Sequence, residues 1–145
     1  MKPQRGYYSL IQFCPDASRL EAVNVGVVLF CPALDFLSAR TTSNNRRAEA
    51  LVGRSRLERA SLNAAKEAIE RRLEVDRGSF QGIEDLENFV NTRGNWLKLT
   101  QARPVKVFNP ESELEKLYAE LVGGKSLRQA RAEEKQLFPT LRTED

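Results

Sequence analysis

The most informative absence from this 145-residue sequence is histidine. Without it there is no Ser-His or Cys-His nucleophile pair, no imidazole general base and no mixed Cys/His zinc site. The two cysteines, Cys14 and Cys31, are too few for a zinc site made of cysteine alone. Catalysis would have to rest on carboxylates, lysine, tyrosine or an added metal, and no residue pattern predicts a metal site or a cofactor.

Long apolar runs are also missing. The longest, Val25 to Cys31, has the length of a strand and not the ~18 residues that a membrane span needs. The first residues, M-K-P-Q-R-G-Y-Y, lack the apolar core of a signal peptide. We therefore expect a cytoplasmic protein that does not enter the membrane.

Three strands are expected near the N-terminus. Tyr7 to Cys14 and Glu21 to Cys31 are rich in aromatic and β-branched residues, and Phe36 to Arg40 follows a turn at Pro32 to Asp35. The short connections predict an antiparallel β-meander. Cys14 and Cys31 would then lie at opposite ends of neighbouring strands, where no disulfide can join them.

Helical spacing of apolar residues follows the meander. It predicts amphipathic helices over Leu57 to Leu73, Ile83 to Val90 and Leu114 to Val122, with a shorter helix around Arg46 to Val52. The sequence Asn109-Pro110 suits the cap and the first position of the last helix.

An extended segment separates the last two helices. Trp96 to Thr100 alternates in polarity, and Val105 to Phe108 continues beyond Pro104, whose missing amide indicates a sheet edge or a bend. The order β-β-β-α-α-β-α predicts the α+β class: a mostly antiparallel sheet built on the N-terminal β-meander, with helices on one face. We expect residues 1–124 to form a single domain and residues 125–145 a charged appendage, partly helical or disordered.

Polar residues in the second strand need an explanation. Simple alternation places Asn24 and Gly26 on the face opposite the one that carries Val23, Val25, Val27 and Leu29. Gly26 would leave room for an aromatic ring from the first strand, supplied by Tyr7, Tyr8 or Phe13. Arg19, Glu21 and Asn24 either fix the hairpin or form a polar site at the mouth of the sheet.

Arginine outnumbers lysine, sixteen to seven, and the formal net charge is +3. The arginines concentrate in one segment, which contains Arg40, Arg46, Arg47, Arg54, Arg56 and Arg59. Guanidinium groups bind phosphate and carboxylate bidentately, so these residues are candidates for phosphate or partner binding. The alternative is a solvated helix face.

Several phrases resemble a family of short bacterial proteins catalogued as domain of unknown function 3037. They are Y-Y-S-L-I-Q-F-C-P-D, R-L-E-A-V-N-V-G-V-V-L-F-C-P, L-T-Q-A-R-P-V and L-E-K-L-Y-A-E-L-V, and they run from about Tyr7 to Val122. The resemblance implies no reaction. It implies a genomic context beside a HipA-like kinase, and so a companion of that kinase in an operon of toxin-antitoxin or defence type.

Three functions remain open. A non-catalytic partner or regulatory protein fits the lack of a catalytic motif, with Leu137 and Phe138 in the charged tail as candidate contacts. A nucleic-acid-binding module would use the arginine-rich segment, although aromatics are not interleaved with it as a stacking platform requires. A small enzyme would use Arg19, Glu21 and Asn24. The sequence favours the first, with a protein partner and weak non-specific nucleic-acid binding.

Overall fold

The computed structural model describes residues 2–15, 21–92 and 97–137. Its strands and helices are, in chain order, β1 (Gln4–Phe13), β2 (Val23–Cys31), β3 (Phe36–Thr41), α1 (Arg46–Val52), α2 (Arg59–Asp76), α3 (Ile83–Thr92), β4 (Leu97–Leu99), β5 (Arg103–Val107), α4 (Pro110–Leu121) and α5 (Leu127–Leu137). The α+β class and the predicted order are confirmed. Two refinements are that the late extended segment is split into β4 and β5, and that the charged C-terminal segment contains α5.

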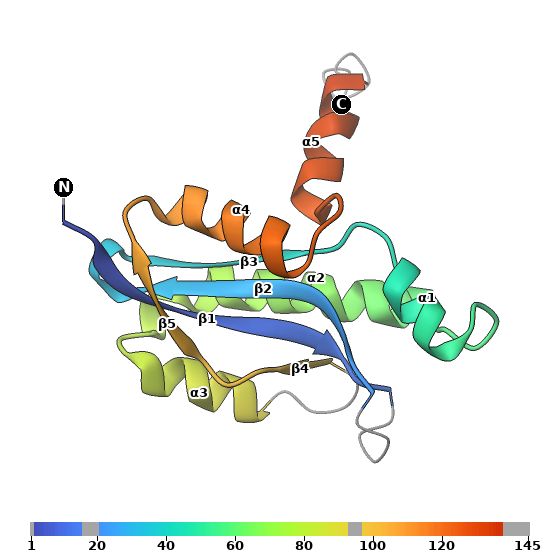
Figure 1. Ribbon diagram of the computed structural model, residues 1–145, viewed down its shortest axis with the longest axis horizontal. Coiled ribbons are helices and arrows are strands. Elements are labelled where there is room, and N and C mark those ends of the chain that lie inside the picture. The colour runs from blue at the N-terminus through green and yellow to red at the C-terminus, as the bar shows by residue number, and fades with distance from the viewer. Residues whose placement is uncertain (1, 16–20, 93–96, 138–145) are drawn as a thin grey trace.

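The strand pairings of the described residues are all antiparallel (Figure 1). β2 lies between β1 and β3, while β4 and β5 share the other side of β1. β4 pairs with residues 11–13 and β5 with residues 4–8. Pro104 lies opposite Tyr7 in the outer strand β5, which confirms the predicted edge position.

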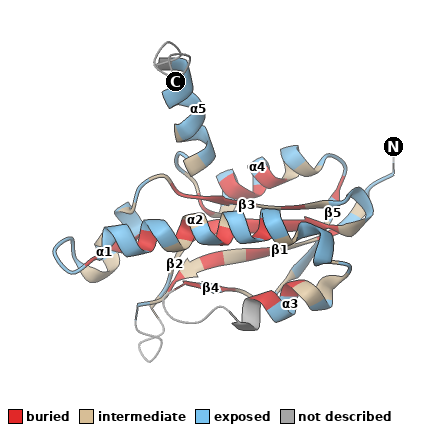
Figure 2. Ribbon diagram, turned by 180° about the vertical axis from the view of Figure 1, so that it is seen from behind, coloured by how far each residue is buried: buried red, intermediate tan, exposed pale blue. Residues whose placement is uncertain are grey.

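Helices cover both faces of the sheet, which corrects the prediction of a single covered face. α1, α2 and α3 pack on one face around a core that includes Phe30 and Leu62, whereas α4 packs Leu114 and Leu117 on the other face (Figures 1 and 2). The cause is β2, whose residues from Val25 to Cys31 are all buried. A strand that is buried on both sides needs a layer on each side.

The start and end of α4 follow from local chemistry. The Asn109 side chain accepts a hydrogen bond of 3.0 Å from the Ser112 amide, and Pro110 occupies the first turn, as predicted. After the helix, Gly123 and Gly124 have positive φ angles of 81° and 80°. Only glycine adopts such angles without strain, so the chain can turn sharply back toward β3.

The two cysteines are free and lie at opposite ends of the β1–β2 pair, as predicted. Cys31 is buried, whereas Cys14 is half-buried. Most of the connection expected between the first two strands lies outside the described residues, as does Trp96 of the predicted extended segment. In the described ranges, no helix combines the length and the apolar character that crossing a bilayer requires.

Candidate functional site

A β-bulge in β2 explains its polar residues. Ile11 pairs with Gly26, but the next residue of β1, Gln12, pairs with Asn24, so Val25 is an extra residue. The carbonyl of Val25 instead accepts a hydrogen bond of 2.8 Å from the amide of Thr42, just after β3. The bulge therefore ties the start of β2 to the segment that leads into α1.

The extra residue reverses the alternation of side chains, so the predicted faces are wrong at this end of the strand. Val23 and Val25 join the core beneath α1 and α2, on the side of Phe30, while Val27 and Leu29 face α4. Asn24 reaches the α4 side. A bulge interrupts the alternation of side chains between the two faces of a strand, so residues before and after it follow different registers.

Gly26 is required by the close approach of the neighbouring strands, and the atoms nearest to it are not aromatic. A Cβ atom there would lie 2.7 Å from the carbonyl oxygen of Arg40 and 3.0 Å from Ile11 and Thr41 side-chain carbons. The predicted partners Tyr7, Tyr8 and Phe13 are not among these nearest atoms. The glycine lets the backbone of β3 lie against β2.

Asn24 joins three parts of the fold. Its side-chain oxygen accepts a hydrogen bond of 2.9 Å from the Gln12 amide group, and its Nδ2 donates one of 3.1 Å to the carbonyl of Leu121. Leu121 is the last residue of α4, whose terminal carbonyls lack partners within the helix. The Asn24 carbonyl accepts a third bond, 3.1 Å long, from Nη1 of Arg47 in α1.

A cavity of about 170 Å³ opens beside this junction. Its lining comes from the β2 bulge, the start of α1 and the turn after α4: Val25, Thr42, Asn44, Asn45, Arg46, Arg47, Ala48, Gly123, Gly124 and Lys125. Three of these residues are cationic and none is acidic. The cavity is therefore suited to a small anionic group.

Lys66 of α2 binds residues 42–45, which form one wall of the cavity. Its Nζ donates to the Thr42 carbonyl at 2.8 Å and to Oδ1 of Asn45 at 2.9 Å. The side chain is buried, and desolvation lowers the pKa of Lys66 to about 8, although Glu70 and Glu67 raise it in part. The residue type of Lys66 suggests a solvated position, but its spacing of four residues from Leu62 and three from Ile69 places it on the buried face of α2, and this spacing is the signal that could have found it.

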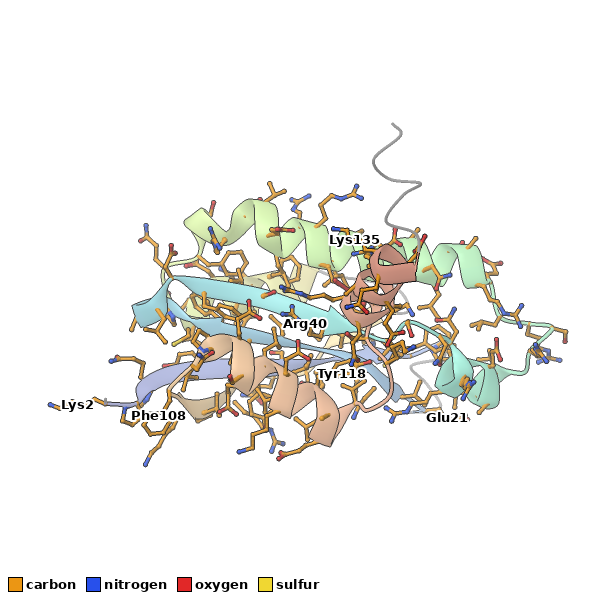
Figure 3. The ribbon with its side chains drawn as sticks, turned by 90° about the horizontal axis from the view of Figure 1, so that it is seen from above. Lys2, Glu21, Arg40, Phe108, Tyr118 and Lys135 are labelled. Atoms are coloured by element: carbon orange, nitrogen blue, oxygen red, sulfur yellow. The ribbon has the colours of Figure 1, made fainter. Side chains whose placement is uncertain are left out.

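Arg40 has a different role from the other arginines of its segment. It is 2% exposed, and its guanidinium forms ion pairs of 2.8 Å with Glu111 and with Glu115, both in α4 (Figure 3). It also donates to the Ser38 hydroxyl and the Ala39 carbonyl. These contacts fasten β3 to α4 and leave the guanidinium turned away from solvent.

The remaining arginines of the segment are exposed, and the structure divides them into two pairs and one separate residue. Arg46 and Arg47 line the cavity. Arg59 pairs with Glu49 at 2.9 Å, and Arg54 approaches the same carboxylate at 4.0 Å. Arg56 lies in the loop that follows α1.

The predicted trio of Arg19, Glu21 and Asn24 is only partly described. Arg19 lies outside the described residues, and Glu21 precedes β2 at the same end of the sheet as α1 (Figure 3). Asn24 contacts Gln12, Leu121 and Arg47. Leu137 is the last residue of α5, and its side chain and Phe138 are outside the described part of the chain.

One local signal in the C-terminal segment would have located α5 more sharply. The Ser126 hydroxyl accepts a hydrogen bond of 3.1 Å from the Gln129 amide, and the Gln129 side chain accepts one of 3.4 Å from the Ser126 amide. These two bonds form a capping box. The sequence S-L-R-Q predicts it, because a serine is followed three residues later by a glutamine.

Comparison with known proteins gives a family and no reaction. The fold is of the α+β class, with a bulge in the central strand β2 and a cavity lined by cationic residues. A family model described as protein of unknown function (DUF3037) matches residues 8–122, and the chain belongs to this family. No curated protein and no solved structure matches it.

Proposed function

We propose that this protein is a non-catalytic partner that binds another protein through helix α5. The observation that carries the proposal is the position of this helix, which stands away from the body of the fold (Figure 1). Residues 131–136 are all exposed, as Figure 2 shows along most of the helix. A helix presented in this way offers a long surface to a partner at little cost to the core.

The base of α5 is well anchored, which supports a role for the exposed part. Thr42 and Ser126 form an isolated antiparallel bridge, and the Ser43 amide donates to the Lys125 carbonyl at 3.0 Å. The Tyr118 hydroxyl donates to the same carbonyl at 3.2 Å. The direction of α5 is therefore fixed by β3 and α4.

Beyond its base, α5 has little to stabilise it within the chain. It has eleven residues, and isolated helices shorter than ~12–15 residues are marginal in water. The exposed pairs of Lys125 with Glu133 and of Arg131 with Glu67 contribute only about 0–1 kcal/mol each. Contact with a partner would supply the burial that the isolated helix lacks.

The identity of the partner is a further part of the proposal. The resemblance described above implies a HipA-like kinase encoded nearby, which makes such a kinase the first candidate, in an operon of toxin-antitoxin or defence type. In this account Leu137 and Phe138 supply apolar contacts next to the charged residues of α5. Residues 1–124 form the folded domain, and residues 125–145 are the appendage that presents the contact surface in the cytoplasm.

The test is capture from the native host with two variants of one residue. Ala132 is exposed in the middle of α5, and proline in a helix interior costs about 3 kcal/mol of local stability. Ala132→Pro should abolish co-purification of the partner while the melting temperature of the domain stays unchanged. Ala132→Ser, the matched control, should retain the partner. Equal capture by both variants would contradict the role of α5.

The second candidate, nucleic-acid binding, is favoured by the exposure of Arg46, Arg47, Arg54 and Arg56. A few phosphate contacts of this kind give weak binding that falls steeply with salt. Fluorescence anisotropy with a labelled duplex should therefore show binding at low salt that is lost at about 150 mM. Sequence-specific, salt-resistant binding would replace the first proposal by the second.

A further inference from the structure

We propose that the cavity between the β2 bulge, the start of α1 and the turn after α4 binds a phosphate group. This site is separate from the exposed surface of α5, and the inference goes beyond the proposed partner role. The claim rests on the size, the charge and the rigidity of the cavity.

Size restricts the ligand first. Pockets for drug-sized molecules have volumes of ~300–1,000 Å³. The cavity has about 170 Å³, so it can take a small group but not a whole nucleotide or a large cofactor. A larger ligand would place one small group inside the cavity, and the rest of the ligand would remain outside it.

Charge then selects an anion. Arg46, Arg47 and Lys125 line the cavity, and no lining residue is acidic. Lys125 shares its charge with Glu133, whereas in the described part of the chain the Arg46 guanidinium has no hydrogen-bond or ion-pair partner. An unpartnered guanidinium beside a second one provides the planar donor sets that phosphate oxygens accept bidentately.

The Arg47 guanidinium is already positioned. Its Nη1 donates to the Asn24 carbonyl, which leaves Nε and Nη2 for a ligand. Nη2 lies beside the Gly123 backbone, 3.4 Å from where a Cβ would be. A donor held before the ligand arrives loses less conformational entropy on binding.

The opposite wall is also rigid. Lys66 binds the Thr42 carbonyl and the Asn45 side chain, and the Asn44 side chain accepts from the Arg46 amide at 3.1 Å. Gly124, which also lines the cavity, has no atom within 4 Å of the place where a Cβ would lie. The site therefore exists in the free protein.

A phosphate dianion fits this charge set better than a carboxylate does. A phosphate monoester carries about −1.5 to −2 charges at neutral pH and has three strong acceptor oxygens, whereas a carboxylate has one charge and two oxygens. The two guanidinium groups match the larger charge, and the Lys125 ammonium group, already paired with Glu133, also lines the cavity. Two sources can supply the phosphate: a free phosphorylated compound and a phosphorylated side chain.

The experiment is a titration of the amide-resolved NMR spectrum with inorganic phosphate at constant ionic strength. Saturable shifts should be confined to residues 42–48 and 123–125, and acetate should produce much weaker binding. Arg46→Gln should reduce the affinity about tenfold or more, because a charge-assisted pair is lost. Arg54→Gln, at an exposed residue outside the cavity, is the matched control and should change nothing.

Two results would overturn the proposal: shifts that are absent or map elsewhere, and an equal loss of affinity in Arg46→Gln and Arg54→Gln. The Arg46 side chain has no hydrogen-bond or ion-pair partner among the described residues, so the Arg46→Gln variant is expected to fold, and its melting temperature checks this. Titration with pyrophosphate and with a phosphoserine peptide then identifies the source of the phosphate. Tighter binding of the peptide assigns a phosphorylated protein, and tighter binding of pyrophosphate assigns a free compound.

Discussion

The main-chain carbonyl of Asn24 accepts a hydrogen bond of 3.1 Å from the guanidinium of Arg47. This contact joins a bulge in the central strand to the first helix, across 23 residues of sequence. The Asn24 side chain meanwhile holds Gln12 and the end of α4. The polar residue in an otherwise apolar strand is thus the point where the sheet, α1 and α4 are fastened together.

Asn24→Ala should destabilise the fold. The variant removes the partner of the Leu121 carbonyl and of the Gln12 amide, both of half-buried residues, and an intramolecular hydrogen bond contributes about 0.5–1.5 kcal/mol net. Thermal unfolding measures the loss. Gln101→Ala, at an exposed loop position, is the control and should leave the melting temperature unchanged. An Asn24→Ala protein as stable as the wild type would show that these hydrogen bonds contribute little.

Gly26→Ala should cost about 1–3 kcal/mol, because the added carbon overlaps the Arg40 carbonyl and the strands must move apart. The urea midpoint of unfolding reports this cost. Gly78→Ala provides the comparison, since nothing lies within 4 Å of the added carbon there. If the two variants unfold at the same urea concentration, close approach at Gly26 has no energetic importance.

Lys66 should make stability rise with pH on the alkaline side. Burial lowers the pKa of Lys66 to about 8 in the folded chain, against 10.5 as its ordinary value. Between these values the unfolded chain keeps a proton that the folded chain has released, so the free energy of unfolding increases with pH. Lys66→Met removes this contribution.

The measurement for Lys66 is the difference in unfolding free energy between wild type and Lys66→Met, followed from about pH 7 to about pH 10. As the pH rises, the unfolding free energy of the wild type should increase relative to that of Lys66→Met. The raised pKa of Tyr118, about 12 because of burial, acts equally in both proteins. Lys116→Met, at an exposed position of α4, should show no such trend, and a flat difference for Lys66→Met would refute the burial argument.

Much of the fold was predictable from the sequence because its signals are local. The apolar spacing around Leu62, Ile69 and Leu73 located α2, and Asn109-Pro110 located the start of α4. The bulge at Val25 could not be read in the same way. It depends on how β1 and β3 pair with β2, and one extra residue reversed the predicted faces of Val23 and Val25.

The candidate site was predictable only in part, since its residues come from distant segments. The arginine-rich segment contains Arg46 and Arg47, but nothing in the sequence separates them from Arg40, which the fold buries against Glu111 and Glu115. Lys125 reaches the cavity only because Gly123 and Gly124 turn the chain back. Such convergence is a property of the tertiary structure.

The central claim, that α5 is the partner-binding element, is tested most directly by hydrogen exchange on the captured complex. In the protein alone, the amides of residues 127–137 should exchange much faster than those of β2, because α5 lacks burial. In the complex the α5 amides should become strongly protected, while protection of β2 stays the same. Unchanged exchange in α5, together with new protection on another surface, would contradict the account.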